Sequence, residues 1–330
     1  MWLVTGATGH VGNVLIRKLL ERGEKVRAMI LPGESRESIS GLRVEAVEGD
    51  AINLDAVFES MRGVKGVFHL AGVISIMPGP NPYVRKVNVE GTQNVIRAAL
   101  ENGIRMIYTS SIHALRRVAD GVIDESASYD PDNPYGAYDR SKAEATLEVL
   151  NAVQTGLDAV VVCPTGVIGP FDFRGSMMGS LIRDAAVARP TLYVDGAYDF
   201  VDVRDVANGL ISAAEKGRRG ESYILSGHKI SIRRLLETVR EITGRDFFQM
   251  KIPLGLAKFA AMFTPMYYRL ANVTPRFTPY SLEVLQSNSN ISHAKATREL
   301  GYQPRSLYES IRDAAGWFLD KRIDYLTLCF

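Results

Sequence analysis

The stretch that decides the fold is TGATGHVG, residues 5–12, which has glycines at positions 6, 9 and 12. An apolar strand-like run, residues 2–5, precedes it, and a segment of helical periodicity, residues 11–22, follows at once. Glycines at this spacing permit a tight turn, close approach of the backbone to a pyrophosphate and close packing of helix on strand. The helix N-terminus adds N–H donors and a positive dipole end. This context favours a dinucleotide-binding loop over an ordinary glycine-rich turn, with candidate binding residues Gly6, Thr8, Gly9, His10, Val11 and Gly12.

The composition is that of a compact folded chain. Of the 330 residues, 46% are hydrophobic and 23% are charged, which argues against a disordered, collagen-like or coiled-coil protein. The formal net charge of +2 gives no strong field for attracting nucleic acid or an anionic membrane. We therefore expect a small-molecule ligand and no nucleic-acid partner.

The cysteines and the apolar segments indicate the cellular compartment and whether the chain crosses a membrane. Cys163 and Cys329 form neither a disulfide framework nor a zinc-ligand cluster, so we expect a reducing, cytoplasmic setting and no metal. The start, MWLVTGATG, is a strand rather than a secretory signal. The most apolar long segment, residues 252–271, is too interrupted to span a membrane, although weak surface association stays open; its interruptions are Pro253, Gly255, Lys258, Pro265 and Arg269.

Alternating strand-like and helical segments organise the first two thirds of the chain. Strands are expected at 2–5, 25–31, 43–47, 66–70, 105–109 and 158–163, and helices at 11–22, 53–61, 83–101 and 138–154. A glycine follows each of these helices, where it can adopt the left-handed cap conformation: Gly23, Gly63, Gly103 and Gly156. The pattern predicts an α/β fold, a Rossmann-type doubly wound parallel sheet with a smaller mixed C-terminal lobe.

The second half has a looser pattern. One more strand is expected at 222–225, and helices near 203–216, 232–243 and 307–321. We assign residues 1–165 to a dinucleotide-binding domain and 166–330 mainly to a substrate-binding lobe. The boundary is soft because no linker separates the halves, and some later elements are expected to return to the sheet.

The end of the second expected strand bears on the choice of cofactor. An acid about 20 residues beyond the glycines usually binds the ribose 2′-hydroxyl of NAD, but Ile30 and Leu31 occupy that place. Without this acid a 2′-phosphate meets no repulsion, and Arg36 could reach it, so NADP(H) is preferred and NAD(H) stays possible. The alternative is that Arg36 is a solvated loop charge. Asp50, followed by Ala51, could accept from the adenine amino group, or simply be a turn residue or N-cap.

A candidate catalytic group lies on the expected helix 138–154. Tyr138 and Lys142 are four residues apart and share one face of the helix. An ammonium near a phenol lowers the phenol pKa, so Tyr138 could exchange a proton near neutral pH. Thr109, Ser110 and Ser111 end a neighbouring strand, at the edge where open α/β sheets bind ligands. The alternative, a surface Tyr and Lys, is disfavoured because the glycine loop and the hydroxyl cluster accompany the pair.

Taken together, these motifs resemble the extended short-chain dehydrogenases/reductases, the NAD(P)-dependent epimerase/dehydratase family. TGATGHVG is similar to the family's TGxxGxxG, YDRSK to its YxxxK, and YTSSIHAL to its strand ending in the catalytic serine, which implies Ser111. The resemblance covers the chain through about residue 320. It implies cofactor contacts for Thr109, Tyr138 and Lys142, and for residues of the segments HLAGV, NVEGTQNV and CPTGVIGP: Ala71, Gly72, Asn88, Pro164 and Val167.

The resemblance carries further implications. FVDVRDVA, residues 200–207, is similar to a family signature in the substrate lobe, and the family implies a homodimer. The missing acid on the second strand departs from many NAD-using members. VRAM and PTGVIGP are similar to the dihydroflavonol reductase-like and 3β-hydroxysteroid dehydrogenase-like branches.

The substrate lobe leaves its ligand open. Residues 247–285 are rich in Phe, Met, Tyr and Leu, which is more typical of core or dimer contact than of a pocket, but a pocket lining would favour an apolar substrate. Five arginines could instead clamp a diphosphate, although each is also a plausible surface charge: Arg174, Arg183, Arg189, Arg204 and Arg276. His113 and His69 are expected to make structural hydrogen bonds, His69 in a partly buried place.

Three functions follow from these observations. The leading one is an oxidoreductase that interconverts a carbonyl and an alcohol on a mostly apolar small molecule, with Ser111 orienting the oxygen, Tyr138 exchanging the proton and Lys142 lowering the Tyr138 pKa and holding the nicotinamide ribose. The alternative is an NAD-dependent sugar-nucleotide epimerase or dehydratase. The third is a catalytically silent nicotinamide sensor, against which the intact Tyr138 and Lys142 pair counts.

Overall fold

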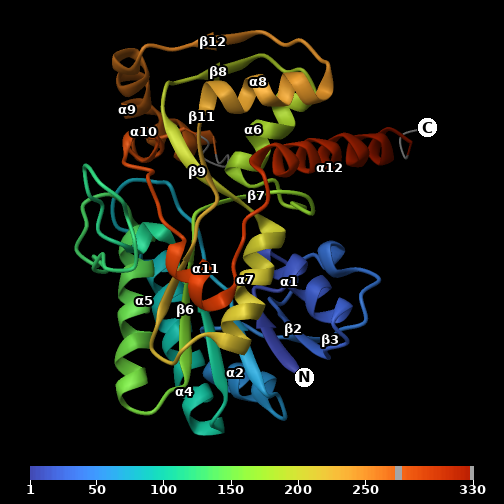
Figure 1. The fold of residues 1–330 in the computed structure, drawn as a ribbon, viewed down its shortest axis with the longest axis vertical. Helices are drawn as coiled ribbons and strands as arrows, with labels where there is room; N and C mark the ends of the chain where they lie inside the picture. The colour runs from blue at the N-terminus through green and yellow to red at the C-terminus, as the bar shows by residue number, and fades with distance from the viewer. Residues whose placement is uncertain (272–276, 328–330) are drawn as a thin grey trace.

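Seven parallel strands form the central sheet of the computed structural model, which describes residues 1–271 and 277–327 (Figure 1). The strand order is β10-β6-β5-β4-β1-β2-β3. The chain order reverses between β1 and β4, and ligands of open α/β sheets bind at such a switch point, beyond the carboxyl ends of the strands. The strands are β1 (Trp2–Thr5), β2 (Val26–Ile30), β3 (Glu45–Glu48), β4 (Gly66–His69), β5 (Arg105–Thr109), β6 (Ala159–Pro164) and β10 (Ser222–Leu225).

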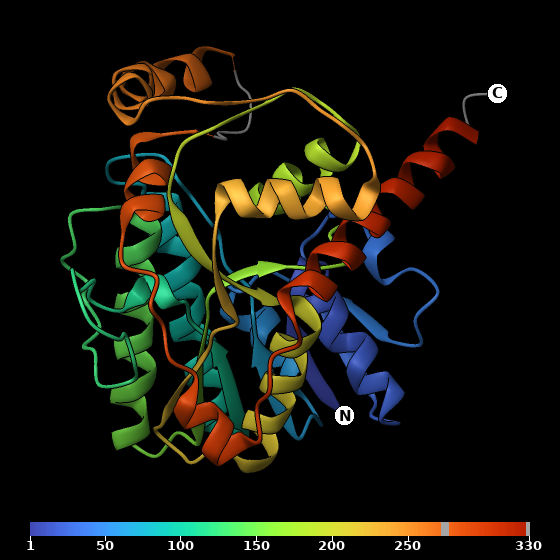
Figure 2. The ribbon, with the colours of Figure 1, turned by 45° about the horizontal axis from the view of Figure 1, so that its top comes forward.

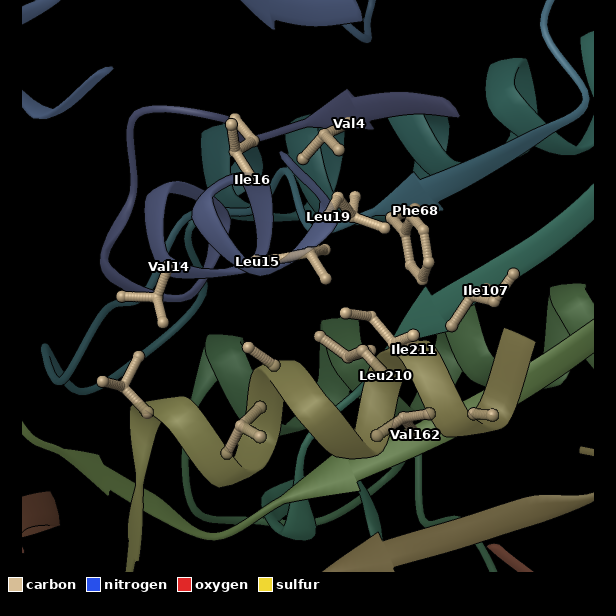
Figure 3. Close-up of a cluster of buried hydrophobic side chains, with 14 of the residues drawn as sticks. Val4, Val14, Leu15, Ile16, Leu19, Phe68, Ile107, Val162, Leu210 and Ile211 are labelled. Atoms are coloured by element: carbon tan, nitrogen blue, oxygen red, sulfur yellow. The ribbon is translucent and has the colours of Figure 1, made fainter. Parts of the chain in front are cut away.

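Helices cover both faces of this sheet, so its inner strands are buried along nearly their whole length and are largely apolar. One face packs against α1 (His10–Glu21), α7 (Val203–Lys216) and α11 (Ala294–Leu300). The other face packs against α2 (Leu54–Met61), α4 (Gly91–Asn102) and α5 (Ala137–Gln154). Figure 3 shows α1 and α7 meeting over the first face, where Leu15 and Leu19 lie near Leu210, Ile211 and the sheet.

A π-helical turn interrupts the helix that enters α4. The short helix α3 (Pro82–Arg85) passes into the turn Lys86–Glu90 and then into α4. The helix expected at 83–101 is therefore present as one continuous helical segment, but with a π-turn inside it. Single π-turns inside helices occur frequently at functional sites. This one contains Asn88, which the sequence places among the cofactor contacts.

The second lobe lies over the carboxyl end of the sheet (Figure 2). Its three-stranded sheet contains β7 (Gly166–Ile168), β9 (Ala197–Asp202) and β11 (His228–Ser231), and a two-stranded sheet pairs β8 (Thr191–Tyr193) with β12 (Gln249–Lys251). Its own core lies between α6 (Met177–Ala186), α8 (Ile232–Thr243) and α12 (Leu307–Thr327). The helices α9 (Leu254–Ala271) and α10 (Pro279–Gln286) complete it, and 3-10 turns occur at Glu37–Ile39 and Ile112–Ala114.

The expected sheet and helices of the first half are confirmed. The four glycines that follow the expected helices all have positive φ: 75° at Gly23, 69° at Gly63, 61° at Gly103 and 124° at Gly156. In the second half α7, α8 and β10 match their expected ranges, whereas β7, β8, β9, β11 and β12 were not expected. Strand β10 returns to the first sheet, so residue 165 does not separate two independent folding units. We propose that it separates the residues that bind the cofactor from those that bind the substrate.

Every helix in the described ranges is too short or too polar to cross a membrane.

Candidate active site

The glycine-rich loop between β1 and α1 leaves no room for a side chain at Gly6 or Gly12. Gly6 has a φ of +65°, and a Cβ there would lie 2.8 Å from the backbone nitrogen of Ala71. A Cβ on Gly12 would lie 2.1 Å from the carbonyl oxygen of Gly6. Gly9 is the N-cap of α1 and has no side chain to satisfy the first-turn N–H groups. These N–H groups and the helix dipole fit a pyrophosphate.

A segment of the second lobe packs against this loop. His10, in the glycine motif, donates from Nε2 to the carbonyl of Pro170 at 2.9 Å, and Asn13 donates to the carbonyl of Phe171 at 3.2 Å. Phe171 is held at a φ of +66°, which is rare for a residue with a Cβ, and its ring lies 4.7 Å from the guanidinium of Arg17. The segment after β7 is therefore fixed to the N-terminal end of α1.

Glu34, an acid that the sequence analysis did not single out, lies beside the glycine loop. The Thr8 hydroxyl donates to Glu34 at 2.7 Å, Arg174 donates to the Thr8 Oγ1 at 2.6 Å, and Arg174 also forms an ion pair with Glu34. Arg36 instead pairs with Glu48 at 2.8 Å and is half exposed, the arrangement of a surface charge. An acid in the loop after β2 was the available signal for Glu34.

The other expected adenosine contacts lie in two loops, Asp50 and Ala51 after β3 and Leu31 after β2. The Asp50 carboxylate accepts from the backbone N–H of Ile52 at 3.1 Å, so it forms a turn of its own. The Ala51 carbonyl accepts from Asn94 at 2.9 Å and fixes this loop to α4. Leu31 is 43% exposed after β2. An adenine contact by Asp50 or Ala51 remains a prediction.

The three expected catalytic side chains are brought together and buried. Tyr138 and Lys142 lie in the first turns of α5, and Ser111 follows β5, where its hydroxyl accepts from the backbone N–H of His113 at 3.2 Å. The Ser111 hydroxyl lies near enough to the Tyr138 phenol to lower its pKa. The Lys142 ammonium donates to the carbonyl of Thr109 at 2.8 Å.

Burial dominates the electrostatics of this group. It raises the pKa of Tyr138 to about 12, although the nearby Ser111 hydroxyl acts in the opposite direction. It lowers the pKa of Lys142 to about 8, because an ammonium loses its hydration there. The expected lowering of the Tyr138 pKa by Lys142 is therefore not seen in this structure, where the ammonium is directed to the Thr109 carbonyl.

The residues between the glycine loop and Tyr138 fit a bound nicotinamide half. A Cβ on Gly72 would lie 3.1 Å from the Asn88 Oδ1, a tight contact, and 3.5 Å from the Lys142 Nζ, so glycine leaves a ligand the most room there. Asn88 accepts from the backbone N–H of Val73 at 2.7 Å and donates to the Ser141 hydroxyl at 2.9 Å.

The strand ends complete this cradle. The buried Thr109 Oγ1 has no hydrogen-bond partner, a condition that a ligand hydroxyl would relieve. Pro164 is buried at the end of β6, and Val167 is half-buried in β7 beside the core under α1. The glycine cradle and the unpaired hydroxyl therefore fit a dinucleotide lying from the N-terminus of α1 to Tyr138.

A buried polar network adjoins Tyr138. His113, whose ring centroid lies 6.3 Å from that of Tyr138, shares hydrogen bonds with the hydroxyl of Tyr198 at 2.6 Å and that of Tyr280 at 3.4 Å. Tyr280 also donates to Asp139 at 2.5 Å. Burial lowers the His113 pKa, which favours the neutral ring. His113 thus makes structural hydrogen bonds as expected, but Tyr198, Tyr280 and Asp139 were not anticipated.

The remaining histidine and arginine candidates have structural partners. His69 is fully rather than partly buried between the hydroxyls of Thr5 at 2.8 Å and Thr92 at 3.0 Å, and burial lowers its pKa to about 3. The arginines considered for a diphosphate clamp are mostly paired with carboxylates: Arg183 and Arg189 with Asp184, Arg204 with Asp202 and Asp313, and Arg174 with Glu34. Arg276 lies outside the described residues. In the described part of the chain no acid, histidine and cysteine cluster could hold a metal.

Comparison with known proteins agrees with this geometry. The chain belongs to the NAD dependent epimerase/dehydratase family, whose model matches residues 2–226. It is an NAD(P)-dependent enzyme of the extended short-chain dehydrogenase/reductase type.

Two relatives and one solved structure are similar to this chain over most of its length. Sterol demethylase protein B of Methylococcus capsulatus is 36% identical over 97% of this chain and 98% of its own. A 3 beta-hydroxysteroid dehydrogenase/Delta 5-->4-isomerase of Mycobacterium tuberculosis is 28% identical over 92% of this chain and 85% of its own, in line with the expected branch. The crystal structure of gox2253 superposes with a TM-score of 0.83 at 34% identity and covers 97% of this chain and 98% of its own.

Proposed function

We propose that this enzyme interconverts a ketone or aldehyde and an alcohol on a mostly apolar small molecule. A dissociable nicotinamide cofactor is the hydride donor or acceptor. The observation that carries the proposal is the meeting of Ser111, Tyr138 and Lys142 at the carboxyl end of β5, beside the Gly72 and Asn88 cradle. When bound, the nicotinamide supplies or accepts the hydride.

Each of the three side chains has a separate role in this proposal. Ser111 orients the substrate oxygen, and Tyr138 donates a proton to it in reduction or removes one in oxidation. Because the Tyr138 pKa is about 12, the phenol is protonated at neutral pH and is ready to donate. Lys142 holds the nicotinamide ribose together with the unpaired hydroxyl of Thr109.

Two observations support an apolar substrate over a sugar nucleotide. The arginines available for a diphosphate, Arg183, Arg189 and Arg204, are already paired with carboxylates. The relatives named above carry the names of enzymes of sterols and steroids. A fused-ring or acyl ketone is therefore the proposed substrate class, and an NAD-dependent epimerase or dehydratase is the second candidate.

NADP(H) is the proposed preferred cofactor, with Arg174, which contacts the glycine loop at Thr8, as the proposed partner of the 2′-phosphate. Leu31, not an acid, follows β2, so no carboxylate lies at the end of this strand. The Arg174 guanidinium donates to the Thr8 hydroxyl. The Glu34 carboxylate by itself would favour NAD(H), because it would repel a 2′-phosphate, but the ion pair with Arg174 offsets its charge. Replacing Arg174 with Gln should weaken NADPH binding at least tenfold and NADH binding little, measured by fluorescence titration; equal losses for the two cofactors would contradict this preference.

Replacing Tyr138 with Phe tests the proposed mechanism. The phenol is lost while the Ser111 and Lys142 side chains stay, so turnover should fall by at least two orders of magnitude. Cofactor affinity, measured separately, should stay within a few-fold of wild type. Near-normal turnover would refute the mechanism, and a silent sensor would show cofactor binding with no turnover in either protein.

The remaining parts of the proposal concern the setting of the enzyme. We propose a cytoplasmic homodimer, in keeping with the free thiol of the buried Cys163 and with the family resemblance. Light scattering during size-exclusion chromatography would measure the mass of the assembly.

A further inference from the structure

Helix α9 packs on the protein through a narrow, small-residue side. Ala257 and Ala261 are buried against Val194 of the β8 region and Leu282 of α10. Figure 2 shows α9 at the outer end of the second lobe, on the side away from α1 and β3. The helix is therefore anchored by one face and open on the other.

The opposite face of α9 is apolar and exposed. Seven large hydrophobic side chains on it are between 59% and 77% exposed: Leu256, Phe259, Met262, Phe263, Met266, Tyr267 and Leu270. Helical spacing puts these positions on one side of the helix. The two-stranded sheet of the same lobe also exposes Leu192 and Met250, and the exposed Phe248 precedes β12. An exposed apolar face of this kind on one helix marks an interaction site. We call the seven exposed hydrophobic side chains of α9 the α9 face.

The stretch of sequence that contains α9 carries only basic charges. From residue 247 to residue 282 the chain contains four basic residues and no Asp or Glu: Lys251, Lys258, Arg269 and Arg276. Lys251 is paired with Asp195, whereas Lys258 is exposed at the edge of the apolar stripe. The whole-chain charge of +2 hides this local excess.

The charge pattern decides between two possible occupants. A second copy pairing through α9 would bring the basic positions of both helices together without an acidic residue on either helix to offset them. An anionic lipid surface supplies the missing negative charge and an apolar layer for the Phe and Met side chains.

We propose that the α9 face docks on an anionic lipid bilayer, with α9 lying in the plane of the headgroups and without crossing the membrane. The aromatic and Met side chains enter the upper acyl region, and Lys258 contacts the headgroup phosphates. This proposal stands apart from the proposed function, since none of the exposed α9 side chains belongs to the catalytic group.

Vesicle co-sedimentation of the full chain tests the proposal. The wild-type protein should pellet with vesicles of equal parts phosphatidylcholine and phosphatidylglycerol, bind pure phosphatidylcholine vesicles much more weakly, and dissociate as salt is raised. The double variant Phe259→Ser/Met266→Ser should lose at least tenfold in partition coefficient. The matched control is Val122→Ser/Tyr308→Ser, which removes two exposed hydrophobic side chains elsewhere and should bind like wild type.

A charge variant tests the second half of the argument. Lys258→Glu should weaken binding to the anionic vesicles, whereas Arg97→Glu on α4, which is also exposed but distant, should not. Unchanged circular dichroism and melting temperature would show that the variants fold.

Three outcomes would overturn the proposal. They are wild-type protein left in the supernatant with anionic vesicles, equal binding to both vesicle types, and an α9 double variant that binds like wild type. A change in oligomeric state on Phe259→Ser/Met266→Ser, with no vesicle binding by wild type, would assign the face to a second copy instead.

Discussion

Replacing Gly12 with Ala should displace α1 from the glycine loop. The new methyl carbon would lie 2.1 Å from the carbonyl oxygen of Gly6, and real Cβ atoms do not come closer than 3.0 Å. The helix would have to withdraw by about 1 Å, against the tightly packed Leu15 and Leu19 beneath it. Overpacking of a core costs up to about 3 kcal/mol, and the better helix propensity of Ala returns about 1 kcal/mol. The expected net loss in the free energy of unfolding is about 2 kcal/mol.

Urea denaturation and cofactor titration measure the two consequences. The Gly12→Ala variant should have a lower urea midpoint and bind NADPH at least tenfold more weakly, because the α1 N–H groups move with the helix. Gly316→Ala is the matched control, since nothing lies within 4 Å of a Cβ at this position of α12. That control should be stabilised by up to about 1 kcal/mol with cofactor affinity unchanged. A Gly12→Ala protein as stable as wild type, with normal NADPH affinity, would refute the steric account of the loop.

The remaining predictions concern the buried charges. Because the Lys142 pKa is lowered to about 8, the folded protein binds fewer protons than the unfolded chain between about pH 8 and pH 10. The stability of wild type relative to Lys142→Met should therefore rise with pH across that window, measured by urea midpoints; a constant difference would contradict the shift. Asp139→Asn should destabilise the protein by about 3 kcal/mol, because the Arg117 ion pair at 3.0 Å is lost in a buried place. Wild-type melting behaviour of Asp139→Asn would show that the network is dispensable.

Local signals made the first half of the fold predictable. The glycine motif, the apolar strands and the glycines after the helices each act over a few residues, and the structure confirms them at β1, α1 and the four positive-φ glycines. The meeting of the three candidate catalytic side chains could be predicted for the same reason. Tyr138 and Lys142 are one turn apart, and Ser111 ends a strand, so the geometry follows once the parallel sheet is known.

Contacts between distant segments were not predictable. Arg174 meets Glu34 from a loop 140 positions away, and Tyr280 meets Asp139 across 141 positions, with no periodicity that links either pair. The strands β7, β8 and β12 contain three residues each, too few for an alternating pattern to show. The exposed α9 face has an apolar composition that resembles a core, and only the structure shows that it faces outward.

The transfer of deuterium from cofactor to product tests the central claim most directly. The enzyme would be incubated with NADPH carrying deuterium at the nicotinamide C4 and with a panel of apolar ketones that includes a 3-oxosteroid, and the products analysed by mass spectrometry. The account predicts one deuterium on the new carbinol carbon and one equivalent of NADP⁺ for each alcohol formed, with both lost in Tyr138→Phe. A protein that holds stoichiometric, non-exchanging NAD and inverts a sugar nucleotide without net consumption of cofactor would contradict it.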